Sequence, residues 1–77
     1  MAVKILSELR AKEKGRIVRV EGGGSIGRRM MDMGVVKGTE VEVVRVAPLG
    51  DPMEVRLKGY SLSVRKEEAE RIKVEVV

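Results

Sequence analysis

The chain has 77 residues, the size of one domain with a thin hydrophobic core. Cysteine and histidine are absent, which excludes disulfides, thiolate or imidazole metal sites and a histidine general base. Tyr60 is the single aromatic residue, so there is no stacking platform for exposed bases. The apolar runs are far shorter than the about 20 residues of a membrane span, and the N-terminal segment lacks the apolar core of a secretory signal. We therefore expect a cytoplasmic protein.

The net charge of +4 is unevenly distributed along the chain. Residues 1–38 hold nine Lys or Arg against four acids, whereas residues 39–77 hold seven against eight. A basic N-terminal half suits an acidic protein surface, nucleic acid or an anionic membrane surface. A solvated surface without any ligand explains the charge as well.

Five segments alternate apolar and polar residues with the period of two that half-buried strands have: 17–20, 41–46, 53–58, 60–65 and 72–76. In the second segment the alternation changes phase between Val43 and Val44, which predicts a β-bulge or a bend. Such bends let a short sheet close into a barrel, which removes the exposed edges. Gly59 separates two of the segments and predicts a tight hairpin, although its turn type stays open.

A first short helix is predicted over 25–33. Ser25 can cap its N-terminus, and Gly34 can take the left-handed conformation that follows a helix. Met31 lies off the apolar face and should be partly exposed. The residues that share the apolar face are Ile26, Met30 and Met33.

A second helix of one turn is predicted over 66–71, because Ala69 and Ile72 share a face. The expected fold class is mostly β: a small five-stranded barrel with two short helices, in a single domain that spans 1–77.

No motif predicts catalysis, a cofactor or a metal. The stretch 22–27 matches G-x-G-x-x-G in letters, but no acidic residue follows on a parallel strand and the chain is too short for a dinucleotide-binding fold. We interpret it as a flexible entry into the helix. The methionines lack neighbouring Cys or His for a soft-metal site, and the carboxylates form no paired constellation.

Two features are candidates for binding. Asp32 lies near the C-terminus of the first helix, where its charge opposes the helix dipole, and we expect it to pair with Arg28 or Arg29. Pro and Gly residues stiffen the loop 47–52, which carries Leu49 at its tip. Leu49 either projects as an apolar docking residue or folds back onto the barrel.

Six short motifs follow one another along the chain: LSEL at 6–9, GRIV at 15–18, RRMMDMG at 28–34, KGTEV at 37–41, APLGDP at 47–52 and LSVRKEEA at 62–69. In order and spacing they resemble the FeoA family of small cytoplasmic proteins of bacterial ferrous iron uptake. The resemblance covers about residues 6–76. The family usually has Leu at the positions of Met30 and Met31, and these exchanges roughly conserve volume.

The resemblance implies an SH3-like barrel. It also implies an accessory or regulatory protein, not an enzyme, that binds the cytoplasmic GTPase domain of FeoB, the ferrous iron permease. Such a protein would reach the inner face of the membrane only through that partner. The same domain type also ends iron-dependent repressors of the diphtheria-toxin-repressor type, where it is fused to a DNA-binding domain that this chain lacks.

The predicted partner-binding patch joins the first helix to the 47–52 loop, with an arginine as charged anchor and Leu49 as the apolar one. Its residues are Arg28, Arg29, Met31, Asp32, Met33, Leu49, Gly50, Asp51 and Pro52. The main alternative is an RNA- or ribosome-binding SH3-like barrel, which the basic first half favours and the lack of aromatics disfavours; we expect no nucleic-acid partner. A GTPase-activating arginine supplied to FeoB by Arg28 or Arg29 is a further hypothesis, and the oligomeric state, including weak self-association, stays open.

Overall fold

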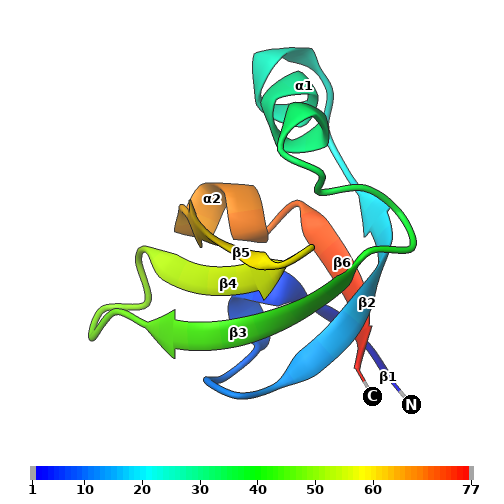
Figure 1. Cartoon of the computed structure of the whole chain (residues 1–77). Coiled ribbons are helices and arrows are strands. Elements are labelled where there is room, and N and C mark those ends of the chain that lie inside the picture. The colour runs from blue at the N-terminus through cyan, green and yellow to red at the C-terminus, as the bar shows by residue number, and fades with distance from the viewer. Residues whose placement is uncertain (1, 77) are drawn as a thin grey trace.

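The computed structural model describes residues 2–76 and consists of one antiparallel sheet with two short helices (Figure 1). In chain order the elements are β1 (Ala2–Ile5), the 3-10 turn η1 (Leu6–Glu8), β2 (Lys14–Val20), α1 (Gly24–Asp32), β3 (Glu40–Val46), β4 (Met53–Leu57), β5 (Tyr60–Val64), α2 (Lys66–Ala69) and β6 (Ile72–Val76). The six strands pair in the order β1-β6-β2-β3-β4-β5. Among residues 2–76, no helix is long and apolar enough to cross a bilayer.

The prediction of five strands was wrong, because β1 is a sixth strand at the edge of the sheet. Its backbone pairs with β6, with Ala2 opposite Val76 and Ile5 opposite Lys73. Three of its four side chains are exposed and the fourth is half-buried. A strand that is held by backbone pairing and buries neither face has no alternating pattern to detect.

The predicted closure of the sheet was also wrong, because the two edge strands, β1 and β5, do not pair with each other. The bulge that suggested closure is present: the register of β3 against β4 shifts between Val43 and Arg45. A bulge bends a strand, whereas closure also requires the two outer strands to hydrogen-bond. The sheet therefore curls around its core and stays open.

The hairpin between β4 and β5 has a two-residue turn. Lys58 and Gly59 both have positive φ, 51° and 85°, as the two central residues of a type I′ turn require. Leu57 and Tyr60 flank the turn and face each other, and the pairing then runs without a shift to Met53 opposite Val64.

The helix α1 begins one residue earlier than predicted, and Gly23, not Ser25, is its N-cap residue. The chain turns into the helix through Gly22 and Gly24, both at positive φ, so Ser25 already lies in the first turn. Ser25 is exposed, and the N-cap position is taken by Gly23, which has no side chain to cap the helix.

The C-terminus of α1 follows the prediction. Gly34 has φ 86°, its N–H donates to the Met31 carbonyl at 3.0 Å, and the Val35 N–H donates to the Met30 carbonyl at 2.9 Å. These two bonds make a Schellman motif. Met30 and Val35 are both buried, so the motif carries its usual apolar contact across the helix end.

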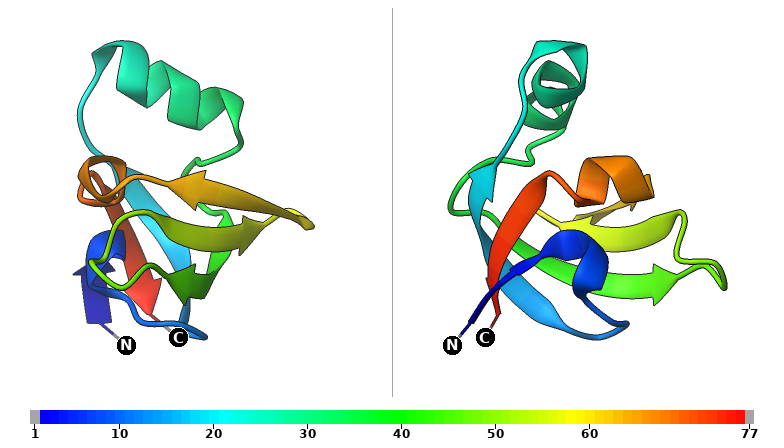
Figure 2. Two further views of the ribbon diagram at one scale, coloured as in Figure 1. Left: turned by 90° about the vertical axis from the view of Figure 1, so that its left-hand side faces the viewer. Right: turned by 180° about the vertical axis from the view of Figure 1, so that it is seen from behind.

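The core lies inside the curled sheet and takes the buried Met30 from α1, against which the partly buried Ile26 of the same helix also packs. Its residues are Leu6, Leu9, Ile17, Met30, Val35, Val41, Val43, Met53, Val55, Leu57, Val64, Ala69, Ile72 and Val74. Ala69 and Ile72 are both buried, as their shared face predicts. Elsewhere α1 projects beyond the sheet, above β5 and α2 (Figures 1 and 2).

We predict that Met30→Ala destabilises the fold by about 2–5 kcal/mol, because it removes the buried side chain of α1 and leaves a cavity. Met31→Ala is the matched control, since Met31 is the next residue and is 64% exposed. It should change stability by less than about 0.5 kcal/mol. Urea denaturation of both variants measures the difference, and equal losses would contradict this packing of α1.

Candidate functional site

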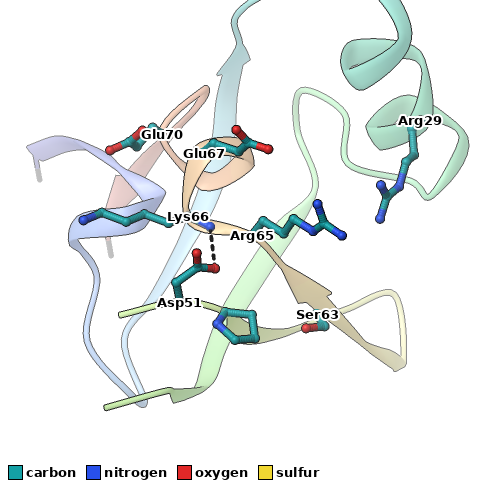
Figure 3. Close-up of a pocket in the computed structure, with 8 residues that line it drawn as sticks. Arg29, Asp51, Ser63, Arg65, Lys66, Glu67 and Glu70 are labelled. Atoms are coloured by element: carbon teal, nitrogen blue, oxygen red, sulfur yellow. Dashed lines mark hydrogen bonds between the residues drawn. The ribbon is translucent and has the colours of Figure 1, made fainter. Parts of the chain in front are cut away.

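A groove separates α1 from α2 and from the loop between β3 and β4 (Figure 3). Its residues are Arg29, Asp51, Pro52, Ser63, Arg65, Lys66, Glu67 and Glu70. Arg29 from α1 and Arg65 from the end of β5 extend into the same part of the groove (Figure 3). One end of the groove is thus rich in guanidinium groups, and the other carries carboxylates.

Glu68 holds Arg29 in place at the end of the groove that is rich in guanidinium groups. Its side chain is 5% exposed, and its carboxylate lies 3.6 Å from the Arg29 guanidinium. The same carboxylate accepts the backbone N–H of Arg65 at 3.1 Å, which satisfies a free donor at the start of α2. One buried carboxylate thus links α2 both to α1 and to the end of β5.

The β3–β4 loop is tied to the other end of the groove. The carboxylate of Asp51 accepts the backbone N–H of Lys66 at 3.1 Å (Figure 3). Within the loop, the N–H of Gly50 donates to the Ala47 carbonyl at 2.7 Å, and the N–H of Ala47 donates to the Pro52 carbonyl at 3.1 Å. These bonds hold the loop in a defined turn.

Leu49 projects from that turn with 91% of its surface exposed, so it does not fold back onto the sheet. Of the two alternatives that the sequence leaves open, the structure selects the exposed one. An apolar side chain held in water by a hydrogen-bonded turn is available for contact with a partner.

The predicted patch does not form one surface. Arg29, Asp51 and Pro52 meet in the groove, but Arg28 and Met31 line a separate depression between α1 and the end of β2. Adjacent helix positions point about 100° apart, which places Arg28 and Arg29 on different sides of α1.

Asp32 and Met33 take other roles. Asp32 is exposed and forms no ion pair within residues 2–76, and Arg29, one of its two expected partners, pairs with Glu68 instead. Met33 is half-buried, and its carbonyl accepts the hydroxyl of Tyr60. That hydrogen bond ties the end of α1 to the start of β5.

Sequence reasoning missed the part of the groove that β5 and α2 contribute. The missed residues are Ser63, Arg65, Lys66, Glu67, Glu68 and Glu70. Glu68 itself gave a usable signal. It stands three residues after Arg65, which precedes the helix, and a glutamate at this spacing is the second residue of a capping box. That spacing would have placed the Glu68 carboxylate at the helix start, next to the groove.

The charge cluster at the end of β2 has a perturbed carboxyl. Glu21 lies 3.0 Å from the Lys73 ammonium and 3.4 Å from the Arg19 guanidinium. The hydrogen bond from Lys73 and its charge, with a smaller contribution from Arg19, hold the pKa of Glu21 below its usual 4.5. Within residues 2–76, no group of three or more acidic side chains is placed to hold a metal ion.

Comparison with known proteins identifies the family. The FeoA domain family matches residues 4–76. An Fe(2+) transport protein A/Fe(2+) transporter FeoB fusion protein of Porphyromonas gingivalis is 44% identical over 72 residues, which are 94% of this chain and 8% of the relative. The chain thus spans a small fraction of that relative's length.

Two solved structures support the same fold. The FeoA-like protein of Clostridium acetobutylicum is 43% identical, with a TM-score of 0.90 over 100% of this chain and 90% of that one. The FeoA of Stenotrophomonas maltophilia, described as an SH3 domain protein and solved with zinc, is 32% identical, with a TM-score of 0.79 over 91% and 87% of the chains. The mostly β, SH3-like fold expected from the sequence is confirmed, as an open six-stranded sheet.

A double-mutant cycle tests the link between α1 and α2. We predict that Arg29→Met and Glu68→Gln couple by about 0.5–1 kcal/mol in unfolding free energy, because each removes one partner of a half-exposed ion pair. Arg28→Met with Glu68→Gln is the control cycle and should be additive within about 0.3–0.5 kcal/mol. Equal coupling in both cycles would contradict a specific Arg29–Glu68 pair.

Lys73→Met should raise the pKa of Glu21 toward its usual 4.5, because Lys73 is the main cause of the lowered value. In the wild type a lowered carboxyl pKa stabilises the fold above pH 4.5, and this contribution is lost as pH falls through the folded-state pKa. NMR titration of the Glu21 carboxyl measures the shift. Arg19→Met, the lesser cause, should give a smaller change, and the reverse order would refute this assignment.

Proposed function

Because this chain belongs to the FeoA family, we propose that it is an accessory protein of ferrous iron uptake that binds the cytoplasmic GTPase domain of the FeoB permease. The fusion relative supports this partner, since the two proteins are there joined in one chain. In this proposal the protein works in the cytoplasm and is recruited to the inner face of the membrane through FeoB.

The observation that carries the proposal is the combination of the groove with the loop that carries Leu49. The groove has two guanidinium groups at one end, and the loop that lines its other end has an apolar tip that is 91% exposed. Burying a leucine side chain contributes about 1.5–3 kcal/mol, and interface arginines that lose their water are frequent hot spots. One apolar anchor and charged neighbours suit a protein partner better than a small substrate.

The proposed action is regulatory binding and not chemistry. The groove holds arginines, a lysine, a serine and carboxylates, with no nucleophile and base arranged as a pair. Any effect on GTP hydrolysis would then come from stabilising one conformation of the FeoB domain. Arg29 is held by Glu68, so a role as an arginine finger would require that ion pair to break.

The test is calorimetric titration of this protein into the isolated cytoplasmic domain of FeoB. We predict that the double variant Leu49→Asp, Arg29→Glu weakens binding at least about tenfold, because it removes the apolar anchor and reverses the charged one. GTP hydrolysis with and without this protein, measured in the same samples, reports whether binding alters turnover.

The matched control is Ala11→Asp, Arg10→Glu. It makes the same change in charge at exposed residues of the loop before β2, away from the groove. It should bind like the wild type. If the folded Leu49→Asp, Arg29→Glu variant binds as tightly as the control, the groove is not the contact surface.

A further inference from the structure

The strand β5 presents free backbone groups along one edge. In a two-residue hairpin the residues that flank the turn exchange both backbone hydrogen bonds, and hydrogen-bonded pairs then alternate with non-bonded ones. Leu57 opposite Tyr60 flanks the turn, so Leu62 and Val64 also bond to β4. The N–H and C=O groups of Ser61 and Ser63 therefore point away from β4, toward the side of β5 that has no neighbouring strand.

The sequence of β5 lacks the residues that usually protect an edge strand, and the helix α1 above it leaves a groove open at Ser63. Proteins protect edges with lysine, proline or bulges in the strand itself, or with a covering element. The β5 sequence Tyr-Ser-Leu-Ser-Val has no charge or proline, and its pairing with β4 has no shift. The other edge strand, β1, carries Lys4 at its third position.

The free edge opens into the groove. Ser63 and Arg65 line the groove from β5, and Arg29 lines it from α1 (Figure 3). The helix α1 runs above β5, and the Tyr60–Met33 hydrogen bond fixes their spacing at the turn end (Figure 2). The unpaired donor and acceptor of Ser63 thus lie beside two guanidinium groups.

The charges select the occupant. In a second copy paired antiparallel through Ser61 and Ser63, the turn that precedes β5 in one copy would meet the chain that follows β5 in the other. Lys58 would then approach Arg65 of the other copy, Arg29 would add further positive charge, and like charges that are brought together across an interface repel each other. Asp51, Glu67 and Glu70 also line the groove. Ser63, however, lies at the end where Arg29 and Arg65 meet, and there an extended segment with acidic side chains finds complementary charge.

We propose that an acidic, extended segment of the protein partner adds to the free edge of β5 as a further strand, with its carboxylates beside Arg29 and Arg65. Main-chain hydrogen bonds to Ser61 and Ser63 hold the segment, and the arginines select its charge. This inference rests on the proposed function, because it describes how the FeoB cytoplasmic domain would occupy the groove.

Amide hydrogen exchange of this protein, alone and saturated with the FeoB cytoplasmic domain, tests the inference. Free Ser61 and Ser63 amides should exchange fast, and the complex should slow both by about tenfold or more. A complex in which both amides still exchange fast overturns strand addition and leaves the proposed function standing. Absence of any complex overturns both. If the Ser61 and Ser63 amides exchange slowly in the free protein and sedimentation shows a dimer, a second copy occupies the edge of β5. This result also overturns the inference.

A pair of variants gives an independent measurement. Ser63→Pro removes the outward N–H without removing a bond to β4, and proline is tolerated on edge strands. It should weaken partner binding about fivefold to tenfold, the value of one backbone hydrogen bond. Ser63→Ala keeps the N–H and should weaken binding less than Ser63→Pro does. Strand addition would be contradicted if a folded Ser63→Pro variant bound the partner as tightly as the wild type does. It would also be contradicted if Ser63→Pro and Ser63→Ala lost the same affinity.

Discussion

The position of α1 depends on how its last turn is anchored. Met30 is the side chain of α1 that enters the core, and the Schellman bonds at Gly34 and Val35 turn the chain back toward β3 immediately after it. The Arg29–Glu68 ion pair and the Tyr60–Met33 hydrogen bond then limit how far the helix can rotate. The groove exists because these contacts hold α1 above β5 and α2 (Figure 2), while Ile26 in its first half packs partly buried against the core.

The sequence predicts those parts of the fold that bury one face. The strands β3 to β6, the bulge at Val43 and the left-handed Gly34 follow from apolar periodicity and glycine chemistry alone. The strand β1 could not be predicted, because backbone pairing with β6 holds it and its side chains stay in water. Closure of the sheet was wrongly inferred. A bulge in one strand predicts only local bending, whereas closure depends on whether the two outer strands of the whole sheet come together.

The residues of the candidate site also fall into those that the sequence could predict and those that it could not. Leu49 and the loop around it could be found, because Pro and Gly residues mark a stiff turn. Arg28 and Arg29 could not be separated by sequence proximity, and only the helix geometry places them in different depressions. Ser63 and Arg65 carried no side-chain signal, since what matters at β5 is a row of backbone groups whose direction depends on the register with β4.

The pairing of β1 with β6 places Ala2 opposite Val76, at the end of the molecule away from α1 (Figure 1). A polypeptide that is attached at either end would therefore start on the side of the molecule away from α1. In a fused arrangement like that of the Porphyromonas gingivalis relative, the connection would act as a tether. A short flexible tether keeps two modules at an effective concentration on the order of millimolar. Even a weak groove contact would then be occupied much of the time, whereas a separate chain would need a tighter contact for the same occupancy.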